Sequence, residues 1–142
     1  MAAQILVPFD GSKHALKALH IASDLACKYK CGVRVLAVVA PGAKPAEDAR
    51  EKALSLVASA QDKLAKWGVH PVEVEVEHGQ IAETILLVAQ RLKVKIIVMG
   101  CRGVPDLEAP SAGTGPLHGD QQFGSVSQKV FHLADCTCIS VK

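Results

Sequence analysis

The sequence is poor in aromatic residues, which make up 4% of its 142 residues. Proteins that bind single-stranded nucleic acid stack bases on aromatic side chains, so we do not expect such a ligand. A basic block or stripe is also missing, because 16 Lys and Arg residues are interspersed with 14 Asp and Glu residues, for a net charge of +2. Phosphate backbones and anionic lipid surfaces attract clustered basic residues. We therefore expect no nucleic acid and no membrane as partner.

Long apolar runs are absent as well. No run approaches the roughly 18 residues of a membrane-spanning helix, and the short apolar stretch near Met1 reaches Asp10 too soon to resemble a secretory signal. We therefore expect a cytoplasmic protein, and a length of 142 residues suits one domain with one core.

The cysteines lack the C-x-x-C spacing of many zinc and redox sites. They are odd in number, at positions 27, 31, 101, 136 and 138, which in a cytoplasmic protein favours reduced thiols. We expect Cys27 and Cys31 to share a helix face, and Cys136 and Cys138 to share a strand face. Small buried hydrophobic roles are the main expectation, with metal or redox chemistry as the alternative.

Apolar stretches that suit buried strands alternate with stretches of helical periodicity. Ser12 is the expected N-cap of the first helix and Gly32 its closing residue. The segment 71–77 alternates Val and Glu, which predicts an edge strand whose acidic face meets water. The expected strands are 5–7, 33–39, 71–77, 94–99 and 137–141, and the expected helices are 12–32, 45–68, 79–92 and 125–134. This order predicts an α/β fold, a parallel sheet with helices on both faces.

Two glycine-containing segments suggest a binding site. Gly100 and Gly103 follow the fourth strand and leave the backbone open to an anion, and Gly124 precedes the fourth helix. Ser125 and Gln128 have the spacing of a capping box, with Ser125 as the N-cap. A strand, a loop and a helix start of this kind can hold phosphate groups.

The chain resembles the universal stress protein family over essentially its whole length. The resemblance rests on VPFDGS at positions 7–12, IVMGCRG at 97–103, GSVSQKV at 124–130 and the closing residues 136–142. It implies an open, twisted, Rossmann-like sheet of five parallel strands in the order 3-2-1-4-5. It also implies a homodimer paired through the last strand, 137–141.

In one subclass of that family a G-x2-G-x9-G-[ST] loop binds ATP or AMP. By resemblance, Asp10 and the backbone near Val38 hold the adenosine here, with Mg²⁺ or Mn²⁺ bridging the phosphates. The full set of nucleotide-binding residues implied in this way is Pro8, Asp10, Val38, Met99, Gly100, Arg102, Gly103, Gly124, Ser125, Val126 and Ser127.

The chain departs from the family pattern in its phosphate loop. Residues 104–123, which we expect to form a flexible inserted loop, take the place of nine residues, so the loop closes either at Gly124-Ser125 or at Gly113-Thr114. The insertion is acidic and holds no Lys or Arg. Cys101 occupies a position where the family usually has Ser or Thr, so it is either a reactive thiol or a tolerated small residue.

Two functions follow as hypotheses. The first is a stress-response regulatory module that binds ATP or AMP and acts through ligand-dependent conformation or dimerisation. The second is a nucleotide-free interaction protein that recruits a partner through the acidic loop. An enzyme has the least support, at most a slow ATP hydrolysis, because no residue stands out as a catalytic base and no G-x4-G-K-[ST] loop is present.

Overall fold

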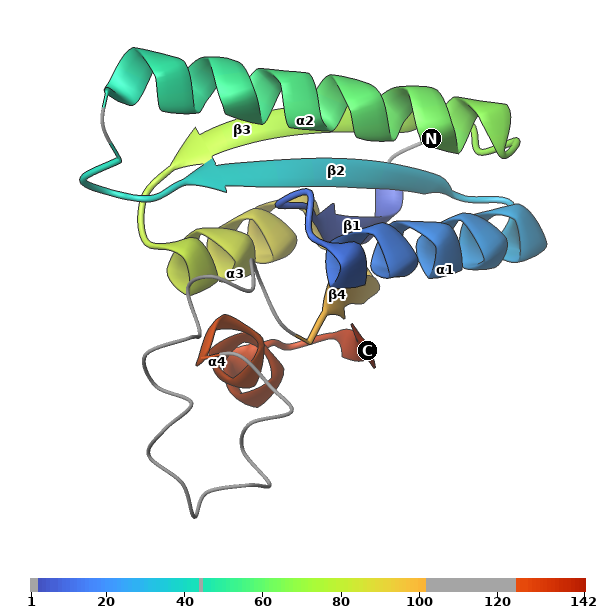
Figure 1. Ribbon diagram of the computed structural model, residues 1–142. Coiled ribbons are helices and arrows are strands. Elements are labelled where there is room, and N and C mark those ends of the chain that lie inside the picture. Colours follow the sequence, from blue (N-terminus) through green and yellow to red (C-terminus); the bar gives the residue numbers. More distant parts are fainter. Residues whose placement is uncertain (1–2, 44, 102–124) are drawn as a thin grey trace.

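The computed structural model describes residues 3–43, 45–101 and 125–142, and it contains one parallel sheet with helices on both faces (Figure 1). The strands have the order β3-β2-β1-β4-β5, as the family resemblance implies. The elements are β1 (Ala3–Pro8), α1 (Lys13–Tyr29), β2 (Gly32–Val39), α2 (Ala46–Lys66), β3 (Val72–His78), α3 (Ile81–Leu92), β4 (Ile96–Gly100), α4 (Ser125–Leu133) and β5 (Thr137–Val141).

Alternate residues of the inner strands face opposite cores. Ile5 and Val7 of β1 pack under α1 and α2, whereas Leu6 packs under α3 and α4. All three side chains are at most 1% exposed. Full burial on both faces explains why these strands are continuous apolar runs, as parallel sheets require. No helix in the described parts of the chain is long and apolar enough to cross a bilayer.

Helix α1 begins as predicted and ends differently. The Ser12 hydroxyl accepts a hydrogen bond from the Ala15 N–H at 3.2 Å, which caps the first turn. The helix ends at Tyr29, and Lys30, with a φ of 55°, occupies the left-handed position that we assigned to glycine. Cys31 thus lies beyond the helix and shares no helix face with Cys27, contrary to our expectation.

Gly32 opens β2 and does not close α1. A Cβ atom at this position would lie 2.8 Å from the carbonyl oxygen of Pro71. The Pro71 carbonyl also accepts a hydrogen bond from the Val33 N–H at 3.1 Å. The glycine is therefore required where β2 and the segment before β3 approach each other.

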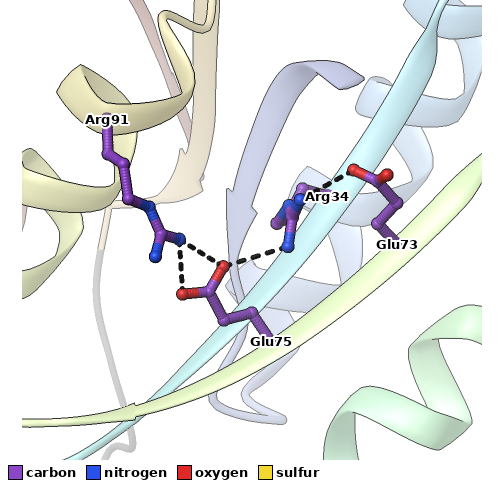
Figure 2. A network of polar contacts seen from close by, with 4 residues as sticks. All are labelled: Arg34, Glu73, Glu75 and Arg91. Carbon is purple, nitrogen blue, oxygen red and sulfur yellow. Dashed lines mark hydrogen bonds and ion pairs between the residues drawn. The ribbon is translucent and has the colours of Figure 1, made fainter. Parts of the chain in front are cut away.

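The acidic face of edge strand β3 is an ion-pair network, and the prediction that it simply faces water was wrong. Arg34 of β2 contacts Glu73 at 2.9 Å and Glu75 at 3.0 Å, and Arg91 of α3 holds Glu75 with both contacts under 2.8 Å (Figure 2). The opposite face behaves as predicted, because Val72, Val74 and Val76 pack against the core.

The network sets the ionisation of its central carboxylate. Burial by itself raises the pKa of Glu75, but a hydrogen bond with Glu77 and the guanidinium groups of Arg91 and Arg34 outweigh burial and hold this pKa below its usual value. The shared hydrogen bond with Glu75 raises the pKa of Glu77. Glu75 therefore stabilises the fold in its charged form.

We expect Glu75→Gln to lower the free energy of unfolding by about 1–2 kcal/mol at pH 7, because it weakens two charged contacts of a side chain that is only 11% exposed. Urea unfolding measures this loss. Since the folded-state pKa of Glu75 is depressed, its contribution is present at neutral pH and is lost as pH falls below the usual carboxyl value of about 4.3. The difference between wild type and variant should shrink over that range.

Glu73→Gln is the matched control. Its side chain is 40% exposed and contacts Arg34 alone in this network, so we expect a loss below about 1 kcal/mol. Equal losses for the two variants would contradict a central role for Glu75.

Candidate functional site

The candidate site lies where the strand order reverses, at the carboxyl ends of β1 and β4. In open α/β sheets ligands bind in the crevice beyond this point. Strand β1 leads through Pro8 and Phe9 to Asp10, whose side chain is exposed and accepts a hydrogen bond from the Ser12 N–H at 2.9 Å. The Phe9 N–H donates to the Leu36 carbonyl at 2.8 Å and fixes the turn against β2. Asp10 is thus a positioned carboxylate at the start of α1.

Gly100 is explained by packing. A Cβ atom at Gly100 would lie 2.7 Å from the His14 Cβ and 2.9 Å from the Ala15 backbone nitrogen, both in the first turn of α1. We expected this glycine to open the backbone to a ligand. The described structure also gives a packing reason for glycine, because α1 begins directly against the end of β4.

Cys101 connects β4 to two later elements. Its N–H donates to the Val141 carbonyl at 2.9 Å, and its own carbonyl accepts a hydrogen bond from the Ser127 hydroxyl at 3.0 Å. The Cys101 side chain is only 2% exposed, and reactive thiols need solvent access. Of the two interpretations offered by the sequence, the geometry favours the tolerated small residue.

Ser125 is the first described residue of α4, and the residues before it lie outside the described part of the chain. The assignment of Ser125 as the N-cap therefore stays a prediction. Ser125 is exposed, Val126 is half-buried and Ser127 is buried. The hydroxyl of Ser127 is engaged with the end of β4, whereas Ser125 remains accessible.

The first turns of α1 and α4 thus both lie against the end of β4. The contacts of Gly100 with His14 and of Cys101 with Ser127 place these two N-termini at one point of the sheet edge. A helix N-terminus carries partial positive charge and unpaired N–H groups. The arrangement therefore favours an anion such as a phosphate group.

A pocket of about 180 Å³ lies at the carboxyl ends of β1 and β2, against the first half of α2. It is smaller than the roughly 300 Å³ or more of pockets that enclose a whole drug-sized ligand, so it suits one ring system rather than a nucleotide. Its lining consists of Phe9, Ala37, Val38, Val39, Ala40, Ala43, Ala49, Lys52, Ala53 and Leu56. Sequence analysis found Val38 alone among these residues.

The described residues bring together the parts of the predicted site that come from β1, β2, β4 and α4. Pro8, Asp10, Val38, Met99, Gly100, Ser125, Val126 and Ser127 all lie at or beside the carboxyl edge of the sheet. Arg102, Gly103, Gly124 and the alternative Gly113-Thr114 lie outside the described residues, as does the loop 104–123. Within residues 3–43, 45–101 and 125–142 no group of three or more His, Cys, Asp or Glu side chains could hold a metal ion.

Comparison with known proteins identifies relatives along the full chain. The family model described as the universal stress protein family matches residues 1–142. A universal stress protein of Synechocystis sp. is 29% identical over 143 residues, which cover 96% of this chain and 83% of that protein. The structure of a universal stress protein from Archaeoglobus fulgidus superposes with a TM-score of 0.77 at 23% identity, and the match covers 100% of both chains.

Two further structures of the same fold carry nucleotides. A universal stress protein in complex with cAMP has a TM-score of 0.74 at 18% identity, over 99% of this chain and 97% of that one. The universal stress protein from Archaeoglobus fulgidus in complex with dAMP has a TM-score of 0.72 at 20% identity, over 99% of this chain and 98% of that one.

We expect Gly100→Ala to lower the free energy of unfolding by about 1–3 kcal/mol in the absence of any ligand, because the added methyl group overlaps the first turn of α1. Thermal or urea unfolding measures the loss. Adding His14→Ala should not rescue the variant, since the close atoms are the His14 Cβ and backbone. Wild-type stability in Gly100→Ala would show that packing does not require the glycine.

Proposed function

The chain belongs to the universal stress protein family, and from this premise we propose that it is a stress-response regulatory module that binds an adenine nucleotide, ATP or AMP. Binding would act through ligand-dependent conformation or dimer state and not through rapid turnover. The observation that carries the proposal is the meeting of the α1 and α4 N-termini at the end of β4.

The shape of the site supports a nucleotide over a simple anion. A base-sized pocket is lined by Val38 and by Phe9, the neighbour of Asp10, and the first turns of α1 and α4 lie at the end of β4. We assign the base to the pocket and the ribose hydroxyls to the exposed Asp10 carboxylate, which is a hydrogen-bond acceptor. The phosphates then extend toward Gly100 and Ser125, and we propose that Arg102, Gly103 and Gly124 complete their binding.

The neighbouring structures support the choice of adenine. Two proteins of the same fold are described with cAMP and with dAMP, and both ligands combine an adenine ring with a phosphate. The triphosphate, and Mg²⁺ or Mn²⁺ as its bridging ion, rest on the family resemblance. A divalent cation would offset the acidic loop 104–123, which otherwise disfavours a polyphosphate.

We expect ATP or AMP at about 100 times its Kd to raise the melting temperature by several degrees, since ligand binding then adds about 2.7 kcal/mol. Asp10→Ala should abolish the shift at the same concentration. Asp24→Ala is the matched control and should keep it, because Asp24 is an exposed carboxylate within α1 that contacts His20 and is not part of the proposed site. Removal of Mg²⁺ and Mn²⁺ with EDTA should weaken ATP binding more than AMP binding.

Failure of ATP, ADP and AMP alike to stabilise the folded protein at millimolar concentration, with either metal present, would sink the nucleotide proposal. The interaction-protein hypothesis would then gain support. Deletion of residues 104–114 would test it, because capture of a partner should depend on that segment.

We also propose that the homodimer implied by the resemblance forms through the free edge of β5. Thr137 donates to the Lys95 carbonyl and the Val141 carbonyl accepts from Cys101, so the odd-numbered residues of β5 bond to β4. In a parallel ladder the N–H and C=O groups of Cys138 and Ser140 then point away from β4. No other strand of the described sheet pairs with this side of β5, so we propose that these groups bond to a second copy of β5.

Ser140→Pro should weaken the dimer at least tenfold, because it removes an N–H from the open edge and leaves the β4 ladder intact. Ser140→Ala, which keeps the N–H, should dimerise as the wild type does. Analytical ultracentrifugation across a concentration series gives the dissociation constants. Equal constants for the two variants would exclude this strand as the interface.

A further inference from the structure

The edge strand β5 carries a buried polar group that the described structure leaves unpaired. Cys138 packs on the side of α3 and α4, whereas Ile139 packs on the side of α1 and α2. Ser140 follows this alternation to the side of Cys138. Its hydroxyl is buried and has no hydrogen-bond partner among the described residues. Buried hydroxyls nearly always have a partner, so we expect a group from outside the described residues to satisfy this one.

A cavity of about 300 Å³ lies close to the start of β5, where α3 and α4 end. Its lining is mostly apolar, but Asp135 contributes a carboxylate between α4 and β5, and Lys93 contributes an ammonium group at the end of α3. A lysine side chain suits such a cavity, because its stem packs on apolar surface while its ammonium group meets an acid. The lining residues are Leu86, Ala89, Gln90, Lys93, Val94, Leu133, Ala134, Asp135 and Cys136.

Two copies that join through β5 can pair in few registers. Two-fold symmetry brings the same edge of each copy together, with the two strands antiparallel. Only the even-numbered residues of β5 turn their N–H and C=O groups away from β4, so even-numbered residues have to face one another. Among the registers that meet this condition, the one centred on Ile139 alone pairs the whole strand Thr137–Val141 with its copy.

We propose that the dimer adopts the register centred on Ile139, and that Lys142 of each copy enters the cavity of the other copy and pairs there with Asp135. This inference rests on the β5 dimer proposed above and specifies how its two strands meet. Ile139 lies on the symmetry axis in this register and faces its own copy. The two Ile139 residues form a non-hydrogen-bonded pair, with their Cα atoms about 4.5 Å apart.

The register supplies the unpaired hydroxyl with a partner. Ser140 lies directly opposite Cys138 of the second copy, on the same face of the joined sheet. The Cys138 thiol donates to the Cys136 carbonyl of its own chain at 3.7 Å. Its sulfur is therefore left as an acceptor for the Ser140 hydroxyl of the second copy.

The same register brings a lysine to the cavity. Lys142 lies opposite Cys136 of the second copy, and alternation along the strand turns it toward the side of α3 and α4. Cys136 and Asp135 both line the cavity on that side. Because Lys93 on the α3 wall has the same charge as Lys142, the incoming ammonium group stays at the Asp135 side. Each dimer contains this contact twice.

A disulfide across the symmetry axis tests the register. A Cα separation of about 4.5 Å lies within the range of about 4.4–6.8 Å that disulfides span. We therefore expect Ile139→Cys to form a disulfide between the two copies of position 139 under mild oxidation, as mapped by mass spectrometry. The wild type is the control and should form no disulfide through β5, because Cys138 lies opposite Ser140 and not opposite itself.

A charge exchange tests the contact of Lys142 with the cavity. Asp135→Lys and Lys142→Glu should each raise the dissociation constant of the dimer about tenfold at low salt, because each replaces two attractive contacts with repulsive ones. The double variant exchanges the charges and should return to within about threefold of the wild type. Asp62→Lys is the matched control and should dimerise as the wild type does, because Asp62 is exposed on α2, which packs on β2 and β3.

Analytical ultracentrifugation separates failure of this inference from failure of the dimer. A dimer of Ile139→Cys without the disulfide, or a wild-type disulfide between two Cys138 residues, overturns the register and leaves the β5 dimer standing. A double variant as weak as the single ones overturns the contact of Lys142 with Asp135. If Ile139→Cys does not dimerise, the charge exchange decides alone. A wild type that is monomeric at every concentration overturns the dimer and the register together.

Discussion

The last residue of β4 lies so close to the first turn of α1 that no room remains between them for a methyl group. Gly100 permits this approach, and the next residue, Cys101, then bonds to both β5 and α4. Strand β4 is thereby joined to α1 and to the last two elements of the chain, α4 and β5. These contacts bring the first turns of α1 and α4 to the end of β4, and the proposed binding of a phosphate rests on that arrangement.

Local physical chemistry made much of the fold predictable. Val72, Val74 and Val76 alternate with glutamates, and this period identified β3 as a half-buried edge strand without knowledge of its neighbours. The Ser12 hydroxyl caps the N–H of Ala15, only three residues later, so this helix start was also predictable from local sequence. The sheet order came from the family resemblance, because periodicity alone does not say which strands are adjacent.

The wrong predictions concern residues whose role depends on distant partners. Gly32 fits a helix end by sequence, yet it is needed because Pro71, 39 residues later, approaches its Cα atom. The glutamates of β3 suggested a wet face because nothing in the sequence indicates that Arg34 and Arg91 reach them. The pocket lined by Phe9 and Val38 was missed for a related reason. It forms because small alanine side chains of β2 and α2 face each other, and the sequence does not show that they do.

The two edges of the sheet differ in charge. Strand β3 presents Glu73, Glu75 and Glu77, whereas β5 consists of the uncharged residues Thr137, Cys138, Ile139, Ser140 and Val141. Natural sheets use charged edge strands to discourage further strand pairing. Two chains that join through β5 would leave an acidic edge at each end of a ten-stranded sheet. In the proposed dimer these charged outer strands would discourage further strand addition and so would limit the size of the assembly.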